Sequence, residues 1–177
     1  MEINELNKPT LGGFGLVRTN GFMGKCIRLG TRSQINHAFV IVHYDEKNDD
    51  WDIVEAEADG AQYSKLSKYK DLEVVFSDFN YAPSQGLDIA RAAENLVGMP
   101  YNFLDIFVLF LLSIGIKNTW IARRAQREDR LICSQLVDRA YHNAGFDLYD
   151  DGRNDGDVTP GDLLMYVAQG YMPMRDH

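Results

Sequence analysis

The chain has 177 residues, a formal net charge of −8 and a pI near 4.9, and 45% of its residues are hydrophobic. This length suits one domain with a sizeable core, and the composition is ordinary for a globular protein. We do not expect nucleic-acid binding, because neutralising phosphates requires Lys and Arg gathered on one face, and this acidic chain has only a local basic spot at Arg123, Arg124, Arg127 and Arg130.

The two cysteines, Cys26 and Cys133, are too few for a disulfide framework and lack the spacing of zinc ligands. Residues 1–11 are expected to form a flexible leader, without the basic and apolar regions of a signal peptide. No apolar stretch reaches the ~20 residues that span a bilayer. We therefore expect one domain over residues 1–177, in a reducing cytoplasm or a virion, with no metal or cofactor.

The first predicted elements are a glycine-flanked strand at about residues 12–18 and a short helix at 22–29, which places Cys26 in the core. Two strands follow at about 36–44 and 51–58. The residues between them are polar, which is typical of a hairpin loop. The sequence therefore predicts an antiparallel pair early in the chain.

Strand alternation decides which side chains of this hairpin share a face. If the end of the first strand pairs with the start of the second, His37 lies opposite residues 55–59. Glu55 and Glu57 share a face, so a carboxylate can sit beside the imidazole and fix its tautomer and orientation. We choose Glu55 and keep Glu57 as the alternative; the other interpretation is two solvated glutamates.

Beyond the hairpin, Gly60 indicates a turn and residues 73–76 a further short strand. A helix is expected to start around Pro83, with Ser84 as its N-cap, and to end before Gly98. Apolar residues recur between these limits at helical spacing. The middle of the chain is therefore expected to mix short strands with an amphipathic helix.

Residues 103–116 are apolar on almost every side, yet too few to cross a bilayer. One interpretation is a fully buried helix. The other is an exposed helix that serves as a lid, as a homodimer face or as a contact with a membrane surface. The sequence leaves these alternatives open.

A helix is expected to begin at Cys133 and to stop at Gly145. Its first turn then holds the sulfur where unpaired backbone N–H groups and the helix dipole stabilise a thiolate. His43 lies ~20 Å farther along the strand of His37, and His142 faces away on the helix. Only His37 can therefore serve this thiol, as a Cys/His pair for nucleophilic catalysis. The alternative is a small buried cysteine with an unrelated histidine.

The last part of the chain contains an acidic, glycine-rich stretch at residues 150–157. Its spacing misses the EF-hand pattern, so we expect a solvated loop and no calcium. Thr159 as cap, Pro160 at the first helical position and Asp162 at the third predict a final helix that runs to Gly170.

Five short motifs occur in a fixed order, namely residues 36–42 (NHAFVIV), 54–56 (VEA), 98–101 (GMPY), 132–137 (ICSQLV) and 159–163 (TPGDL). In that order the chain resembles the circularly permuted NlpC/P60 proteins. These are papain-like thiol enzymes of the YiiX/YaeF type, related to the lecithin:retinol acyltransferase group. The resemblance covers about residues 13–168.

The resemblance implies an α+β papain-like fold, with a small antiparallel sheet packed against the Cys helix and additional helices. It makes Cys133 the nucleophile, His37 the base and Glu55 the residue that orients the base. Tyr101 matches a tyrosine that lies close to the nucleophile and helps to stabilise the oxyanion. The chain departs from the pattern in lacking the usual Gly-Asp start at residues 13–15 and in its apolar segment.

The expected reaction is acyl transfer through a thiol acyl-enzyme, and the resemblance favours amide bonds in cell-wall peptides or related small peptides. A lipid acyl substrate is the alternative within the same chemistry, because residues 103–116 suit an apolar lid. Alternatives of another class are an inactive binding or structural module, for example of a phage virion, and a membrane-associated adaptor.

Overall fold

A computed structural model describes residues 8–19, 35–57, 59–77, 79, 82–100, 133–149, 158–170 and 174–175. Our predictions for Cys26, for Tyr101, and for residues 1–7, 103–116 and 150–157 fall outside these ranges. Within these ranges, no helix has the length and apolar character needed to cross a membrane.

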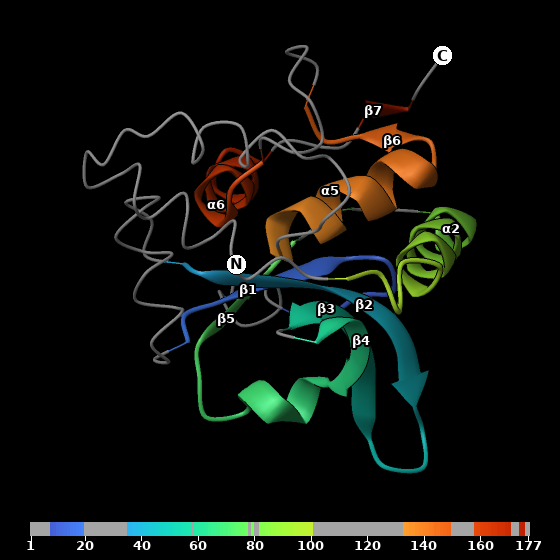
Figure 1. Ribbon diagram of the computed structural model, residues 1–177, viewed down its shortest axis with the longest axis vertical. Helices are drawn as coiled ribbons and strands as arrows, with labels where there is room; N and C mark the ends of the chain where they lie inside the picture. The colour runs from blue at the N-terminus through green and yellow to red at the C-terminus, as the bar shows by residue number, and fades with distance from the viewer. Residues whose placement is uncertain are drawn as a thin grey trace.

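The centre of the described part is a five-stranded antiparallel sheet (Figure 1). Its strands are β1 (Phe14–Val17), β2 (His37–Asp45), β3 (Asp50–Glu57), β4 (Gly60–Lys65) and β5 (Val74–Phe76), in the order β4-β3-β2-β1-β5. A two-stranded ribbon pairs β6 (Phe146–Asp147) with β7 (Met174–Arg175). The expected α+β class with a small antiparallel sheet is therefore what the structure shows.

The predicted β2–β3 hairpin is present and sets the register of the sheet. Phe39 pairs with Glu55 and Ile41 with Ile53, and a register shift follows Ile41. The connection is polar, and the Asp45 carboxylate accepts bonds from the backbone N–H groups of Lys47 and Asn48. Strand β4 was not predicted, because its short sequence is polar and shows no clean alternation.

The two faces of the sheet carry different layers. Three helices lie on one face: α2 (Pro83–Glu94), α5 (Cys133–Asn143) and α6 (Pro160–Ala168) (Figure 1). Their apolar residues form the main core with alternate residues of β1 and β2. A smaller apolar cluster on the other face packs against the 3₁₀ helix η1 (Leu66–Tyr69). Burial on both sides explains why the central strands are apolar at successive positions.

The helix starts follow capping chemistry. Thr159 and Asp162 form the predicted capping box, in which the Asp162 N–H donates to Thr159 Oγ1 and the Thr159 N–H to Asp162 Oδ2. The predicted N-cap Ser84 of α2 is wrong by two residues. The N-cap is Ala82, because Pro83 takes the first helical position and the Gln85 side chain accepts from the Ala82 N–H.

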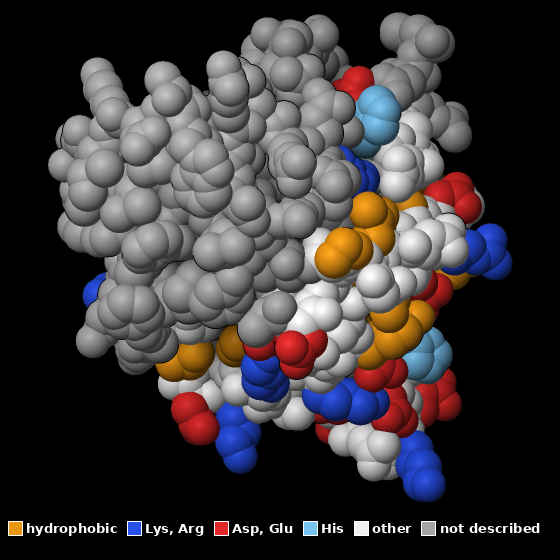
Figure 2. Space-filling view, in the orientation of Figure 1, with side chains coloured by type: hydrophobic (Ala, Val, Ile, Leu, Met, Phe, Trp, Pro, Cys, Tyr) orange, Lys and Arg blue, Asp and Glu red, His pale blue; other side chains and the backbone are white. Residues whose placement is uncertain are grey.

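Charges of both signs alternate on the face of the described surface in Figure 2, where blue and red side chains lie side by side. Lys65, for example, pairs with both Asp45 and Asp52.

Helix α2 crosses the chain just before β1 at a close backbone contact. A Cβ on Gly86 would lie 2.4 Å from the carbonyl oxygen of Leu11, and a Cβ on Gly12 would lie 2.4 Å from the carbonyl oxygen of Gly86. Neither neighbour is a flexible side chain, so the backbone itself would have to move. Glycine is therefore needed at this crossing for lack of space.

We predict that Gly86→Ala lowers the free energy of unfolding by about 1–3 kcal/mol through overpacking. A loss of stability would be informative, because alanine without a clash stabilises the interior of a helix by about 1 kcal/mol relative to glycine. Denaturant unfolding measures the change. Ser84→Ala, at an exposed position of the same helix, is the control and should stay within about 0.5 kcal/mol. A Gly86→Ala chain as stable as wild type would contradict the crossing.

Candidate functional site

His37 opens β2, and the structure places Glu55 of β3, rather than Glu57, against its ring. His37 Nε2 donates to Glu55 Oε2 over 2.6 Å. Because Phe39 pairs with Glu55, the two side chains are diagonal neighbours on one face of the sheet, within reach of each other. The Glu55 side chain is fully buried, and that of His37 is 12% exposed. This carboxylate is therefore not one of two solvated glutamates.

A buried carboxylate requires several donors, and Glu55 has them. Lys68 Nζ lies 2.7 Å from Glu55 Oε1, and the Tyr69 hydroxyl donates to Glu55 Oε2. The Ser64 side chain also hydrogen-bonds to Glu55. With His37, four side chains from β2, β4 and η1 hold one carboxylate.

Tyr69 is itself held by aromatic packing. Its ring stacks on Phe39, with centroids 5.3 Å apart and an interplanar angle of 2°. The Phe39 ring in turn fills the space beside Gly15, where a Cβ would lie 2.3 Å from the ring. The hydroxyl of Tyr69 is thus aimed at Glu55 by packing that continues from β1 through β2 to η1.

Sequence reasoning missed Ser64, Lys68 and Tyr69. Their contacts depend on η1 folding back beneath the sheet, and no periodicity or motif in the sequence predicts the position of η1. The only signal is a Lys-Tyr pair shortly after a strand, which is too common to identify a site.

Cys133 begins α5, where the sequence expects it, and its side chain is buried. The thiol donates to the backbone carbonyl of Asn36 over 3.9 Å, and Asn36 directly precedes His37. The next residue, Ser134, is buried and donates to the Val158 carbonyl over 2.6 Å. The start of α5 is therefore fixed on one side to the start of β2 and on the other to the residues before α6.

His37 and Cys133 approach from opposite faces of the sheet and meet at its end. Cys133 belongs to the core under the helices. His37 is on the same face of β2 as Phe39 and Ile41, which is the face that packs against η1. Cys133 is nevertheless close enough to His37 to be among the groups that raise the pKa of its ring. Since Nε2 is bonded to Glu55, Nδ1 is the ring nitrogen that remains for the sulfur.

The protonation of the pair follows from these bonds. Burial alone would lower the pKa of His37, but its hydrogen bonds to Cys133 and Glu55 outweigh burial and raise the pKa to about 9. Burial alone would raise the pKa of Glu55, but its bonds to His37, Lys68 and Ser64 lower it to about 2. At neutral pH the site therefore favours an imidazolium beside a carboxylate.

These shifts make stability depend on pH in opposite senses. The pKa of His37 is raised on folding, so its contribution is complete below its ordinary pKa of 6.5 and is lost as the pH rises through about 9. The pKa of Glu55 is lowered, so its contribution is complete above 4.5 and is lost as the pH falls through about 2. Both contributions are complete between pH 4.5 and 6.5.

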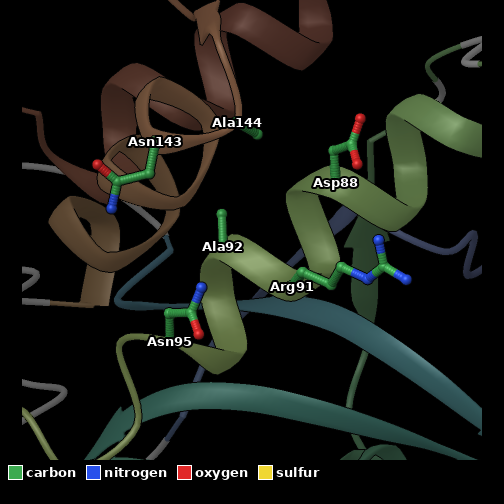
Figure 3. Close-up of a pocket in the computed structure, with 6 residues that line it drawn as sticks. All are labelled: Asp88, Arg91, Ala92, Asn95, Asn143 and Ala144. Atoms are coloured by element: carbon green, nitrogen blue, oxygen red, sulfur yellow. The ribbon is translucent and has the colours of Figure 1, made fainter.

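A shallow pocket of about 290 Å³ lies between α2 and the end of α5 (Figure 3). Its lining residues are Asp88, Arg91, Ala92, Asn95, Asn143 and Ala144. Asn143 ends α5, so it lies ~15 Å along the helix axis from Cys133. The pocket is therefore separate from the group formed by Cys133, His37 and Glu55.

A comparison with solved structures finds this fold in YiiX from Escherichia coli O157:H7, which is described as a metalloprotein. The TM-score is 0.55 at 22% sequence identity, and the match covers 77% of this chain and 66% of that one. The chain thus spans just under two thirds of that protein's length. No family model and no curated protein matches the chain.

The likeness confirms the predicted fold, an α+β architecture of the papain-like YiiX type. The relationship to the lecithin:retinol acyltransferase group, inferred from the motifs, stays a prediction. The catalytic roles of Cys133, His37, Glu55 and Tyr101 also stay predictions, because a likeness at this identity concerns the fold alone.

Three neighbouring side chains of this site are of types that bind metal ions. His37, Glu55 and Glu57 present ligand atoms within 4.8 Å of one another, and imidazole with carboxylates is a donor set that binds zinc and iron. Here, however, Lys68 Nζ bonds both carboxylates, and His37 Nε2 is bonded to Glu55. A metal ion would meet an ammonium group, so these residues do not fit one.

We predict that Tyr69→Phe lowers the free energy of unfolding by about 2 kcal/mol, because the change removes a bond to a buried charge while keeping the ring packed. Urea unfolding at pH 6–7 measures the change. Tyr44→Phe is the matched control, since the Tyr44 hydroxyl bonds Asp49 on the exposed surface. It should change stability by less than about 0.5 kcal/mol. Equal effects of the two substitutions would contradict the buried role of Tyr69.

Proposed function

We propose that this protein is a cysteine hydrolase that cleaves an amide bond of a small peptide, with cell-wall peptides as the first substrate class. The observation that carries the proposal is the His37–Glu55 hydrogen bond beside Cys133, in which a buried carboxylate holds an imidazole whose pKa the thiol helps to raise. The three side chains come from β2, β3 and the start of α5. Its support is this geometry together with a fold of the papain-like type.

In the proposed reaction, His37 Nδ1 already holds the proton of the Cys133 thiol when the substrate binds. The sulfur then attacks the substrate carbonyl carbon, and the C–N bond breaks as His37 returns the proton to the leaving amine. A water molecule, deprotonated by His37, attacks the resulting thioester and releases the acid and the thiol. Because the pKa of His37 is about 9, the imidazole holds the thiol proton at neutral pH and can donate it to the leaving amine.

The developing oxyanion needs donors that are already in place. The Cys133 backbone N–H at the first turn of α5 is available for this, because N-terminal helix N–H groups have no partner within the helix. Tyr101 is the second proposed donor on the strength of the family resemblance. Glu55 does not touch the substrate; it is a positioning residue for His37.

A second candidate function is an inactive binding module that keeps the fold. It is favoured by one observation, namely that Cys133 is only 2% exposed, whereas a nucleophile must meet a substrate carbonyl. The reactivity of the thiol separates the two functions, because an activated thiolate reacts with electrophiles while a structural cysteine is inert.

We predict that iodoacetamide alkylates Cys133 at least about tenfold faster than Cys26 at neutral pH. His37→Ala should remove this advantage, because the thiol loses its base. Mass spectrometry of the two cysteine peptides measures both rates in one sample. His43→Ala is the matched control, since His43 is exposed in the same strand. Equally slow alkylation of both thiols would favour the inactive module.

We further predict that the chain hydrolyses small peptides from cell-wall digests, and that Cys133→Ala abolishes the release of new amines. Glu55→Gln should lower kcat/KM by about 10²-fold or more, because the imidazole loses its orienting charge. Glu46→Gln, in the exposed connection of the same hairpin, should leave kcat/KM unchanged.

Short-chain lipid esters, tested beside the peptides, decide the substrate class. Turnover of esters alone, again lost in Cys133→Ala, would replace the peptide substrate by the lipid acyl alternative. Turnover that survives Cys133→Ala would contradict thiol catalysis.

A further inference from the structure

Within the described part of the chain, Lys68 brings a positive charge next to the predicted catalytic pair. Lys68 Nζ lies 2.7 Å from Glu55 Oε1 and also bonds Glu57 Oε1. Glu55 is fully buried, whereas Glu57 and Lys68 are 36% and 41% exposed. The ammonium thus bridges an inner and an outer carboxylate at the end of β3.

The same carboxylates, with His37, are the donor set considered above for a metal ion. Two carboxylates beside one imidazole attract a divalent cation, since they offer two negative charges and three ligand atoms. Lys68 supplies a positive charge at that place and has three N–H donors, two of which these bonds engage. A covalently attached cation is always present, so no ion has to be acquired from solution.

We propose that Lys68 is a built-in cation, which occupies the place of a divalent metal ion between Glu55 and Glu57 and fixes the Glu55 carboxylate toward His37. Lys68 is therefore a positioning residue. Its effect on Cys133 rests on the proposed function, whereas the exclusion of metal ions does not.

The geometry explains how a lysine 41% exposed can act on a buried pair. Glu55 uses Oε2 for His37 and Tyr69 and Oε1 for Lys68. A carboxylate held at both oxygens cannot rotate about its terminal bond, so the Oε2 that receives His37 stays in place. Without Lys68, Oε1 keeps no charged partner and two carboxylates face each other across its former position.

Binding of Mn²⁺ tests the exclusion of metal ions, because Mn²⁺ prefers carboxylate and imidazole ligands to thiols. Free Mn²⁺ is followed by electron paramagnetic resonance during titration of the full chain. We expect little binding by wild type and by Lys68→Arg, which keeps the charge. Lys68→Met removes the charge and keeps the stem, and it should bind one Mn²⁺ at least about tenfold more tightly.

Two further variants define the site. Lys68→Met combined with Glu57→Gln should lose the gained binding, because one of the carboxylate ligands is gone. Lys70→Met, which removes an exposed lysine two positions away, should behave as wild type. Should Lys68→Met fail to fold, Lys68→Gln is the second neutral variant. Binding of Mn²⁺ by wild type as tight as by Lys68→Met, or no gain in a folded neutral variant, would overturn the proposal.

The alkylation rate of Cys133 tests the positioning role in the same samples. Lys68→Met should slow it by about tenfold and Lys68→Arg should restore most of the wild-type rate, which a loss of packing alone would not do. An unchanged rate in Lys68→Met overturns this role. If wild-type Cys133 reacts no faster than Cys26, the proposed function has failed, while the Mn²⁺ result is still decided by its own measurement.

Discussion

One interaction organises the described site, the bond from His37 to the buried carboxylate of Glu55. An ionised carboxylate shielded from water is costly unless several donors surround it. Four side chains supply these donors, and they come from elements that are separate in the sequence. The carboxylate can be buried in its charged form only when β2, β3, β4 and η1 are all in place, so the orientation of the imidazole depends on all four elements.

The thiol of Cys133 approaches His37 from the face of the sheet opposite to the one that carries Glu55 and η1. Helix α5 packs on the side that carries the main core, and its first residue, Cys133, reaches the start of β2. There it meets His37, whose ring lies on the η1 side. The sheet thus contributes His37 and the helical layer contributes Cys133, so the two side chains come together only when the helices pack on the sheet. The bond from Ser134 to the Val158 carbonyl then keeps the helix start from sliding.

Local chemistry was sufficient to predict much of this site. Alternation along the hairpin placed Glu55 and Glu57 on the face of His37, and apolar spacing with Gly145 gave the Cys133 helix its limits. The capping box at Thr159 was equally readable, because Asp162 lies three residues away in the chain. Each of these predictions depends on residues that are neighbours in the sequence or on adjacent strands.

Features that depend on how the chain folds back after β3 could not be predicted from local sequence. Strand β4 is polar and short, and η1 becomes informative only when it is folded beneath β2 and β3. The partners Lys68 and Tyr69 therefore came from the structure. The N-cap of α2 was misplaced for a smaller reason: Ser84 has good capping chemistry, but Pro83 takes the first helical position, which puts the cap at Ala82, and the Gln85 side chain accepts a bond from the Ala82 N–H.

The central claim is that His37 holds a proton between a carboxylate and a thiol. The measurement closest to that claim is an NMR titration of the His37 ring between about pH 5 and 10, with the resonance assigned by its loss in His37→Gln. We predict a pKa near 9 in wild type and a lower pKa in Cys133→Ala, because the thiol partner is gone. A wild-type pKa at or below the ordinary value of 6.5 would contradict the claim.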